Sequence, residues 1–133
     1  MDKSDHIAAL VEYRLEQALE CLDSAKLSMD TSLKFAANRS YYCIFHSMRA
    51  VLATIGFDSK KHSGVIGEFR QKFIKSGAFP KHLSNYIKDA FTIRNHSDYM
   101  DFYVVAREDV ETQIKNAEEF YSTAKKYLIG DKP

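Results

Sequence analysis

Residues 36–55 read AANRSYYCIFHSMRAVLATI, a stretch without glycine or proline that predicts one long α-helix. At about 100° per residue, its large apolar side chains gather on one side of that helix. They are Tyr41, Ile44, Phe45, Met48, Val51, Leu52 and Ile55. The stretch runs into GFDSKK, in which Gly56 occupies the usual stop position of a helix. The pattern predicts a helix that buries one broad face in a hydrophobic core.

A second side of the same helix carries hydrogen-bond donors. Five polar residues fall within roughly 100° of one another on the helical wheel, and we call them the donor stripe. They are Asn38, Arg39, Tyr42, His46 and Arg49. A solvated helix face usually contains lysine and glutamate, and this stripe contains neither. The stripe is therefore either an unusual outer face or a binding surface.

Helical patterns also fill most of the remaining chain. Apolar residues recur at steps of three and four between Ile7 and Ala25, and further helices are predicted over about 62–75, from Pro80 onward, and over about 107–128. The alternating pattern DFYVVA, residues 101–106, is too short and isolated to build a sheet. We therefore predict one all-α domain over residues 1–133, folded as an antiparallel bundle of four or five helices.

Composition agrees with one globular domain and narrows its class. The chain has 133 residues, 45% of them hydrophobic, with only five glycines and two prolines. Cys21 and Cys43 are too few for a disulfide framework or a zinc site, and the histidines are scattered, so we expect no metal and no cofactor. No apolar run approaches the ~20 residues of a membrane span. We expect a cytoplasmic protein that does not contact a membrane.

Charge is distributed unevenly along the chain. Residues 31–96 carry eleven basic and three acidic side chains, whereas residues 1–30 and 97–133 are acidic on balance. Either the acidic outer helices neutralise a basic central pair, or the middle of the chain forms an anion-binding surface. In the second case the surface would extend over Arg39, Arg49, Lys60, Lys61, Arg70 and Arg94.

The sequence RNHSDY, residues 94–99, continues the fourth predicted helix. Arg94 and Asp98 are four residues apart and fall in line with the apolar side of that helix, so both are predicted to point inward. A hydrophobic pair of similar volume is often no less stable than a buried ion pair. The pair therefore either fixes the helix register or lines a groove in which Arg94 meets an anionic ligand. His96, on the opposite side, is predicted to be exposed.

The segment KKHSGVIGEF, residues 60–69, opens the third predicted helix. His62 is expected in its first turn, and Lys60 and Lys61 in an exposed turn before it. These three residues are candidate binding residues, because Lys60 and Lys61 belong to the basic middle of the chain and their positive charges would attract phosphate.

Three segments in this order resemble a small bacterial and archaeal branch of the HEPN family, the higher-eukaryote-and-prokaryote nucleotide-binding domains. They are AANRSYYCIFHSMRAVL (36–52), KKHSGVIGEFRQKFIKSG (60–77) and IRNHSDY (93–99). The resemblance extends from about Val11 to Leu128. It implies a five-helix antiparallel bundle, often dimeric, that is commonly encoded beside a minimal nucleotidyltransferase. Many members are ribonuclease toxins.

The ribonuclease motif of that family is an Arg, a polar residue directly after it, and a His separated from the Arg by four to six residues. Arg94 and Asn95 match its start, and Asp98 and Tyr99 follow where this branch lacks the His. The positions open to that His hold Tyr99, Met100 and Asp101. Tyrosine, with a pKa of about 10, is a poor replacement for imidazole in acid–base catalysis. His46 of the donor stripe is a candidate replacement.

Three functions are compatible with this resemblance. A binding module would hold a nucleotide or RNA at Arg94 and act with a separately encoded minimal nucleotidyltransferase, in a system of the toxin–antitoxin type. A metal-independent ribonuclease would cleave RNA at the same place. A scaffold would use Arg94 and Asp98 to lock a dimer interface. A homodimer is expected because a second copy would match the inward polar groups, and the binding module is favoured because the motif His is absent.

Overall fold

The computed structural model describes residues 3–100 and 103–130, and within them it contains helices and no strand. The helices are α1 (Lys3–Leu27), α2 (Leu33–Ala53), α3 (His62–Phe69), α4 (His82–Tyr99) and α5 (Arg107–Ile129), with a π-helical turn, η1 (Arg70–Ile74), directly after α3. The predicted all-α fold is confirmed.

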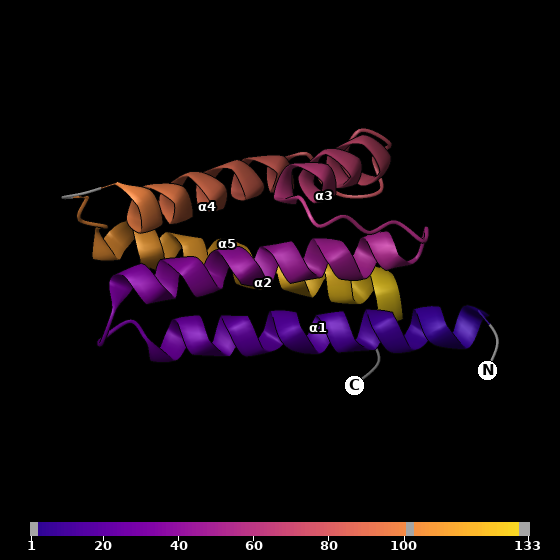
Figure 1. Ribbon diagram of the computed structural model, residues 1–133, viewed down its shortest axis with the longest axis horizontal. Helices are drawn as coiled ribbons and strands as arrows, with labels where there is room; N and C mark the ends of the chain where they lie inside the picture. Colours follow the sequence, from indigo (N-terminus) through magenta and orange to yellow (C-terminus); the bar gives the residue numbers. More distant parts are fainter. Residues whose placement is uncertain (1–2, 101–102, 131–133) are drawn as a thin grey trace.

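Helix α2 lies at the centre of the bundle (Figure 1). Helices α1 and α4 run along two of its sides, antiparallel to it, and α5 lies behind it. The short α3 packs beside the C-terminal half of α2 (Figure 1). The remaining face of α2, opposite α5, is therefore bordered by α1 on one side and by α3 and the C-terminal half of α4 on the other.

The core forms around α2 because its apolar side is broad. Tyr41, Ile44, Met48 and Val51 are fully buried, as the sequence predicts. Ile55 is the exception in the predicted core face, with 48% of its surface exposed. The helix has ended by Ala53, and the chain then turns at Gly56, whose positive φ of 70° suits glycine. Ile55 thus belongs to the turn and not to the buried face.

Helix boundaries differ from the predicted ones by a few residues. Helix α2 begins three residues earlier than predicted, because the Ser32 hydroxyl caps it by accepting a hydrogen bond from the Phe35 N–H at 3.1 Å. Helix α4 begins at His82 and not at Pro80, which lies in the preceding turn. The third predicted helix is divided into α3 and η1, where the N–H of Lys75 reaches back to the carbonyl of Arg70.

The predicted strand pattern at residues 101–106 falls partly outside the described residues, which exclude 101 and 102. Residues 103–106 form no regular secondary structure. Over the described parts of the chain, every helix is too short or too polar to cross a lipid bilayer.

Candidate functional site

The donor stripe is the half-buried side of an otherwise buried helix. Between Ala36 and Ala53 its five members are only partly buried, and every other residue of α2 is buried. Its side chains lie between α1 and α4, because Arg39 contacts Cys21 of α1 and Tyr42 accepts a hydrogen bond from Arg94 of α4. A plain solvated face would be exposed, so the stripe is not one; side chains of α1 and α4 cover part of it.

Helix α4 brings Arg94 against the middle of the donor stripe. The Arg94 guanidinium donates a long hydrogen bond of 3.4 Å to the Tyr42 hydroxyl, and its carbon lies 5.5 Å from the ring centres of Tyr41 and Tyr42. Cation–π contacts of this kind hold a guanidinium in place and leave most of its donors free. Arg94 is thus anchored by aromatic rings.

The predicted ion pair between Arg94 and Asp98 is present. Arg94 Nε lies 3.0 Å from Asp98 Oδ2, and the two side chains keep 14% and 21% of their surface exposed. The Nε–H does not point at the carboxylate well enough to count as a hydrogen bond, so the contact is held by charge alone. The pair points inward as predicted, but it stays in contact with solvent at the edge of the stripe.

Asn38 links this ion pair to Arg39. The Asn38 amide donates to Asp98 Oδ2 at 3.4 Å, and its carbonyl oxygen accepts hydrogen bonds from Arg39 Nε and Nη2 at 3.0 and 2.7 Å. The Arg39 guanidinium lies 5.1 Å from the Tyr42 ring centre. A shallow cavity of about 330 Å³ opens beside Asn38 and Asp98 at the N-terminal end of α2. These contacts place two guanidiniums, those of Arg39 and Arg94, within 5.5 Å of the centre of one tyrosine ring.

His62, the first residue of α3, packs against the same two rings as Arg94, those of Tyr41 and Tyr42. Its Nδ1 is joined to the buried Tyr41 hydroxyl by a hydrogen bond of 2.8 Å, and its ring stacks on Phe45 at 4.2 Å between centres. Burial, with the charges of Arg94 and Arg49, lowers the pKa of His62. The sequence suggested His62 only as a helix start or a phosphate contact. A helical wheel shows the faces of one helix and cannot show which residues of another helix pack against them.

His46 is a second imidazole, placed further along the stripe. Burial first, and then the charges of Arg49, Arg39 and Arg14, lower the pKa of His46 to about 4. Its Nδ1 is buried and, within the described residues, has no hydrogen-bond partner. His46 is therefore uncharged at neutral pH. Arg49 lowers the pKa of both imidazoles, whereas Arg39 and Arg14 act on His46 and Arg94 acts on His62.

The far end of the stripe contains a cluster that sequence reasoning missed. Arg14 of α1 donates to the Arg49 carbonyl at 2.9 Å and lies 3.2 Å from Asp58, which also lies 3.3 Å from the Arg49 guanidinium. We call Arg14, Arg49 and Asp58 the distal cluster. The sequence did contain a signal for this cluster. Arg14 is a basic residue on the apolar side of the first helix, three residues after Val11 and four before Ala18.

The other sequence candidates lie around this site without joining it. Tyr99 is 71% exposed, although the Arg94 guanidinium carbon lies 5.7 Å from its ring centre. Asn95 is half-buried, and Lys60 and Lys61 are exposed in the turn before α3, as predicted. Asp101 lies outside the described residues.

His96 and Arg70 have structural partners of their own. The prediction that His96 is exposed is wrong: it is half-buried, and its ring packs edge-on to Tyr103 at 5.3 Å between centres. Arg70 donates to the Ser84 hydroxyl and carbonyl at 2.9 and 3.1 Å, and so ties η1 to α4. It lines a groove of about 390 Å³ between α3 and α4 that also reaches His62.

The ion pairs bear on the uneven charge of the chain. Lys26 of α1 pairs with Glu118 of α5, and Arg107 of α5 pairs with Asp30 in the loop after α1. The stripe residue Arg49 pairs instead with Asp58. The acidic C-terminal segment also contributes, because Asp98 pairs with Arg94 and Glu119 lies 2.6 Å from His82, so part of the basic middle is neutralised from outside it.

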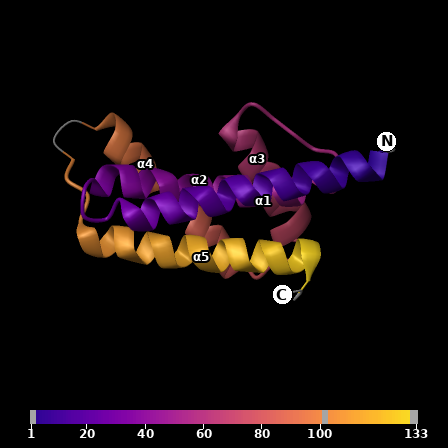
Figure 2. The same ribbon diagram turned by 90° about the horizontal axis from the view of Figure 1, so that it is seen from below.

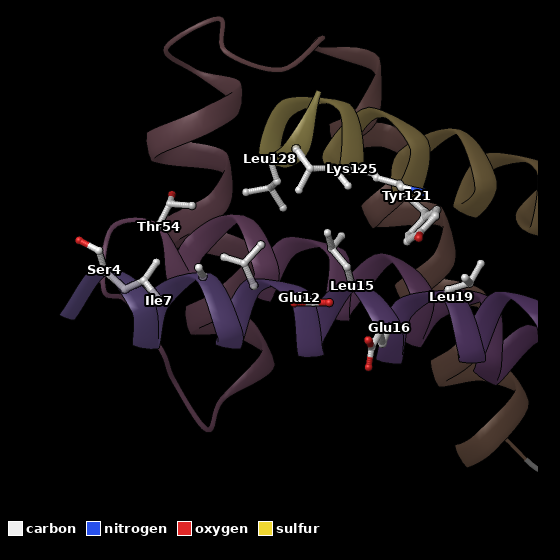
Figure 3. Close-up of a pocket in the computed structure, with 13 residues that line it drawn as sticks. Ser4, Ile7, Glu12, Leu15, Glu16, Leu19, Thr54, Tyr121, Lys125 and Leu128 are labelled. Carbon is white, nitrogen blue, oxygen red and sulfur yellow. The ribbon is translucent and has the colours of Figure 1, made fainter. Parts of the chain in front are cut away.

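A larger cavity than these two lies elsewhere, between α1 and α5 (Figure 3). It has a volume of about 710 Å³ and is lined mainly by aliphatic side chains such as Ile7, Leu15 and Leu128. Its lining includes no histidine or arginine, so it offers little chemistry, and we place the candidate site at the donor stripe. In the described residues, no three His, Cys, Asp or Glu side chains come close enough to hold a metal.

Comparison with known proteins shows which family the chain belongs to. A sequence model described as the HEPN domain matches residues 11–127. A UPF0332 protein of Thermotoga maritima is 37% identical over 123 residues, which cover 92% of each chain. Two proteins of Methanocaldococcus jannaschii, both named as candidate toxins, are 33% and 34% identical, and the alignments cover 91% and 96% of this chain and 88% and 92% of theirs. The chain therefore belongs to the HEPN domain family.

Proposed function

We propose that this HEPN domain binds a nucleotide or single-stranded RNA along the donor stripe, with Arg94 as the central phosphate contact. The observation that carries the proposal is the placement of Arg94 from α4 over the rings of Tyr41 and Tyr42 on α2. Guanidiniums bind phosphate through several N–H donors, and aromatic rings stack on bases without sequence preference. The relatives named as candidate toxins support a toxin-like role for such a module.

The partners expected from the sequence remain part of this proposal. We propose that the chain is a homodimer and that it acts with a separately encoded minimal nucleotidyltransferase. Exposed apolar side chains support the dimer: Tyr99 and Met100 end α4, Val104 follows, and Phe35 lies at the adjacent end of α2. A second copy on this end would cover them and lie next to Arg94. Analytical ultracentrifugation at micromolar concentration should give a dimer mass, and a monomer mass would contradict this part.

A second candidate, metal-independent RNA cleavage, is favoured by the position of His62. The motif His is absent from α4, but His62 supplies an uncharged imidazole close enough to Arg94 to be affected by its charge. Such a group can take the proton of a ribose 2′-hydroxyl, while Arg94 stabilises the charge that develops on the phosphate. His46, the candidate chosen from the sequence, stays untested in this role.

The proposed binding is tested by removing Arg94 and, in a control variant, an arginine far from the donor stripe. Fluorescence anisotropy with a labelled oligouridylate compares wild type, Arg94→Ala and Arg107→Ala. Arg107 is half exposed on α5 and pairs with Asp30, so its loss removes the same charge away from the stripe. Arg94→Ala should weaken binding about tenfold or more, because charge-assisted hydrogen bonds are lost.

Two outcomes would contradict the proposal. Equal affinities of Arg94→Ala and Arg107→Ala would mean that any binding reflects net charge and not this site. A variant Arg94→Ala that becomes monomeric but binds RNA as well as wild type would favour the scaffold function instead.

A further inference from the structure

The distal cluster holds more positive than negative charge. Arg14 is 4% exposed, and both it and Arg49 contact the single carboxylate of Asp58, which is 53% exposed. A buried guanidinium needs a counter-ion, and one carboxylate meets the need of one guanidinium. The Arg49 Nε is buried and, within the described residues, has no hydrogen-bond partner. Asp58 therefore leaves this pair of arginines incompletely satisfied.

Asp58 reaches the arginines from a loop and not from a helix. The loop joins α2 to α3, and Figure 2 shows it on the side of the bundle opposite α5, where the donor stripe lies. Partial burial alone would raise the pKa of Asp58, but hydrogen bonds from Arg49 and from the Ser59 N–H outweigh it and lower that pKa. An ionised carboxylate thus lies on two guanidiniums in the position that a bound phosphate would take.

The spacing along α2 separates this cluster from Arg94. Arg94 contacts Tyr42, and Arg49 follows Tyr42 by seven residues, a rise of about 10 Å. His46 lies between them, with its uncharged imidazole ring 5.9 Å from that of Tyr42. Two positions for anions, with aromatic rings between them, match a strand with several phosphates better than a single phosphate group.

We propose that the distal cluster is a second phosphate subsite, which binds one phosphate of an oligonucleotide strand while Arg94 binds another. In the free protein the Asp58 carboxylate occupies this subsite and competes with the ligand. The inference rests on the proposed RNA binding and narrows the ligand from any nucleotide to an oligonucleotide. It also assigns Arg14, which lies outside the stripe, a role in holding Arg49 and the ligand.

The first test removes the competing carboxylate. Asp58→Asn should bind a labelled oligouridylate about fivefold more tightly than wild type at low salt, because a like charge about 4 Å from the phosphate is gone. The salt dependence of binding should steepen by about 0.7, the value for one additional phosphate contact. Asp30→Asn is the matched control, since it removes another carboxylate paired with an arginine, away from the stripe.

The second test uses Arg49→Gln, which keeps Asp58 as the counter-ion of Arg14 and so avoids stranding a buried charge. It should weaken oligouridylate binding about tenfold and leave uridine monophosphate binding within a factor of about two, because a single phosphate is held at Arg94. Circular dichroism at the assay temperature confirms that each variant is folded.

The outcomes separate this inference from the proposed function. If Arg94→Ala abolishes binding but Asp58→Asn matches Asp30→Asn, or if Arg49→Gln weakens both ligands equally, the second subsite is refuted and the binding module stands. If neither wild type nor Asp58→Asn binds the oligouridylate, both proposals are overturned.

Discussion

Acid should destabilise this protein through the imidazole of His46, whose pKa is lowered to about 4, and His62, whose pKa is also lowered, acts in the same direction. In the folded chain the pKa of His46 is about 4, because burial and the arginines Arg49, Arg39 and Arg14 oppose its protonation. In the unfolded chain a histidine has a pKa of about 6.5. Between these two values the unfolded state binds more protons than the folded state, so the free energy of unfolding decreases as the pH falls through this window.

The size of the effect follows from the two pKa values. With a folded value of about 4 and an unfolded value of about 6.5, the loss of stability relative to neutral pH is about 1 kcal/mol at pH 6, about 2 kcal/mol at pH 5 and about 3 kcal/mol at pH 4. A surface substitution usually changes stability by less than about 0.5 kcal/mol. The predicted effect is therefore large enough to measure as a difference between two variants.

Urea unfolding followed by circular dichroism provides the assay. Between pH 7.5 and pH 5, His46→Gln should lose about 2 kcal/mol less stability than wild type, since other titrating groups cancel in the comparison. His6→Gln, which removes an exposed histidine of α1, is the matched control and should follow wild type. Parallel pH dependences of wild type and His46→Gln would refute the inference that His46 is buried and uncharged in the folded protein.

Three further results are expected. Arg94→Ala should cost about 2 kcal/mol of stability, between the values of exposed and buried ion pairs, because Arg94 and Asp98 are only partly exposed; urea unfolding would show no loss if the pair were only a surface contact. If the domain cleaves RNA, the reaction should persist in EDTA, leave a 2′,3′-cyclic phosphate and be lost in His62→Ala; cleavage by that variant would exclude His62 as the base. Neutralising Lys60 and Lys61 together should flatten the salt dependence of RNA binding without unfolding the protein, and slopes equal to those of wild type would exclude both lysines from the interface.

The fold was largely predictable because helical periodicity is a local property. The apolar side of residues 36–55 identified the central helix, and its donor stripe identified the half-buried face, since both depend only on the angle between successive residues. The inward direction of Arg94 and Asp98 followed from the same rule. The errors concern helix ends. Ile55 is exposed beyond the end of α2 and Pro80 precedes the start of α4, because capping and turn contacts determine where a helix begins and ends.

The composition of the site depended on contacts between elements that are distant in the chain. One helical wheel could not show which imidazole shares the rings of Tyr41 and Tyr42 with Arg94, since His62 meets these rings only when α3 packs against α2. Arg14 and Asp58 are 44 residues apart and meet only because the loop after α2 brings Asp58 to Arg14 of α1 and Arg49 of α2. The sequence by itself determined the helices and the faces they present, whereas only the packing of those faces decided which charged groups meet, because that depends on how helices and loops approach one another in three dimensions.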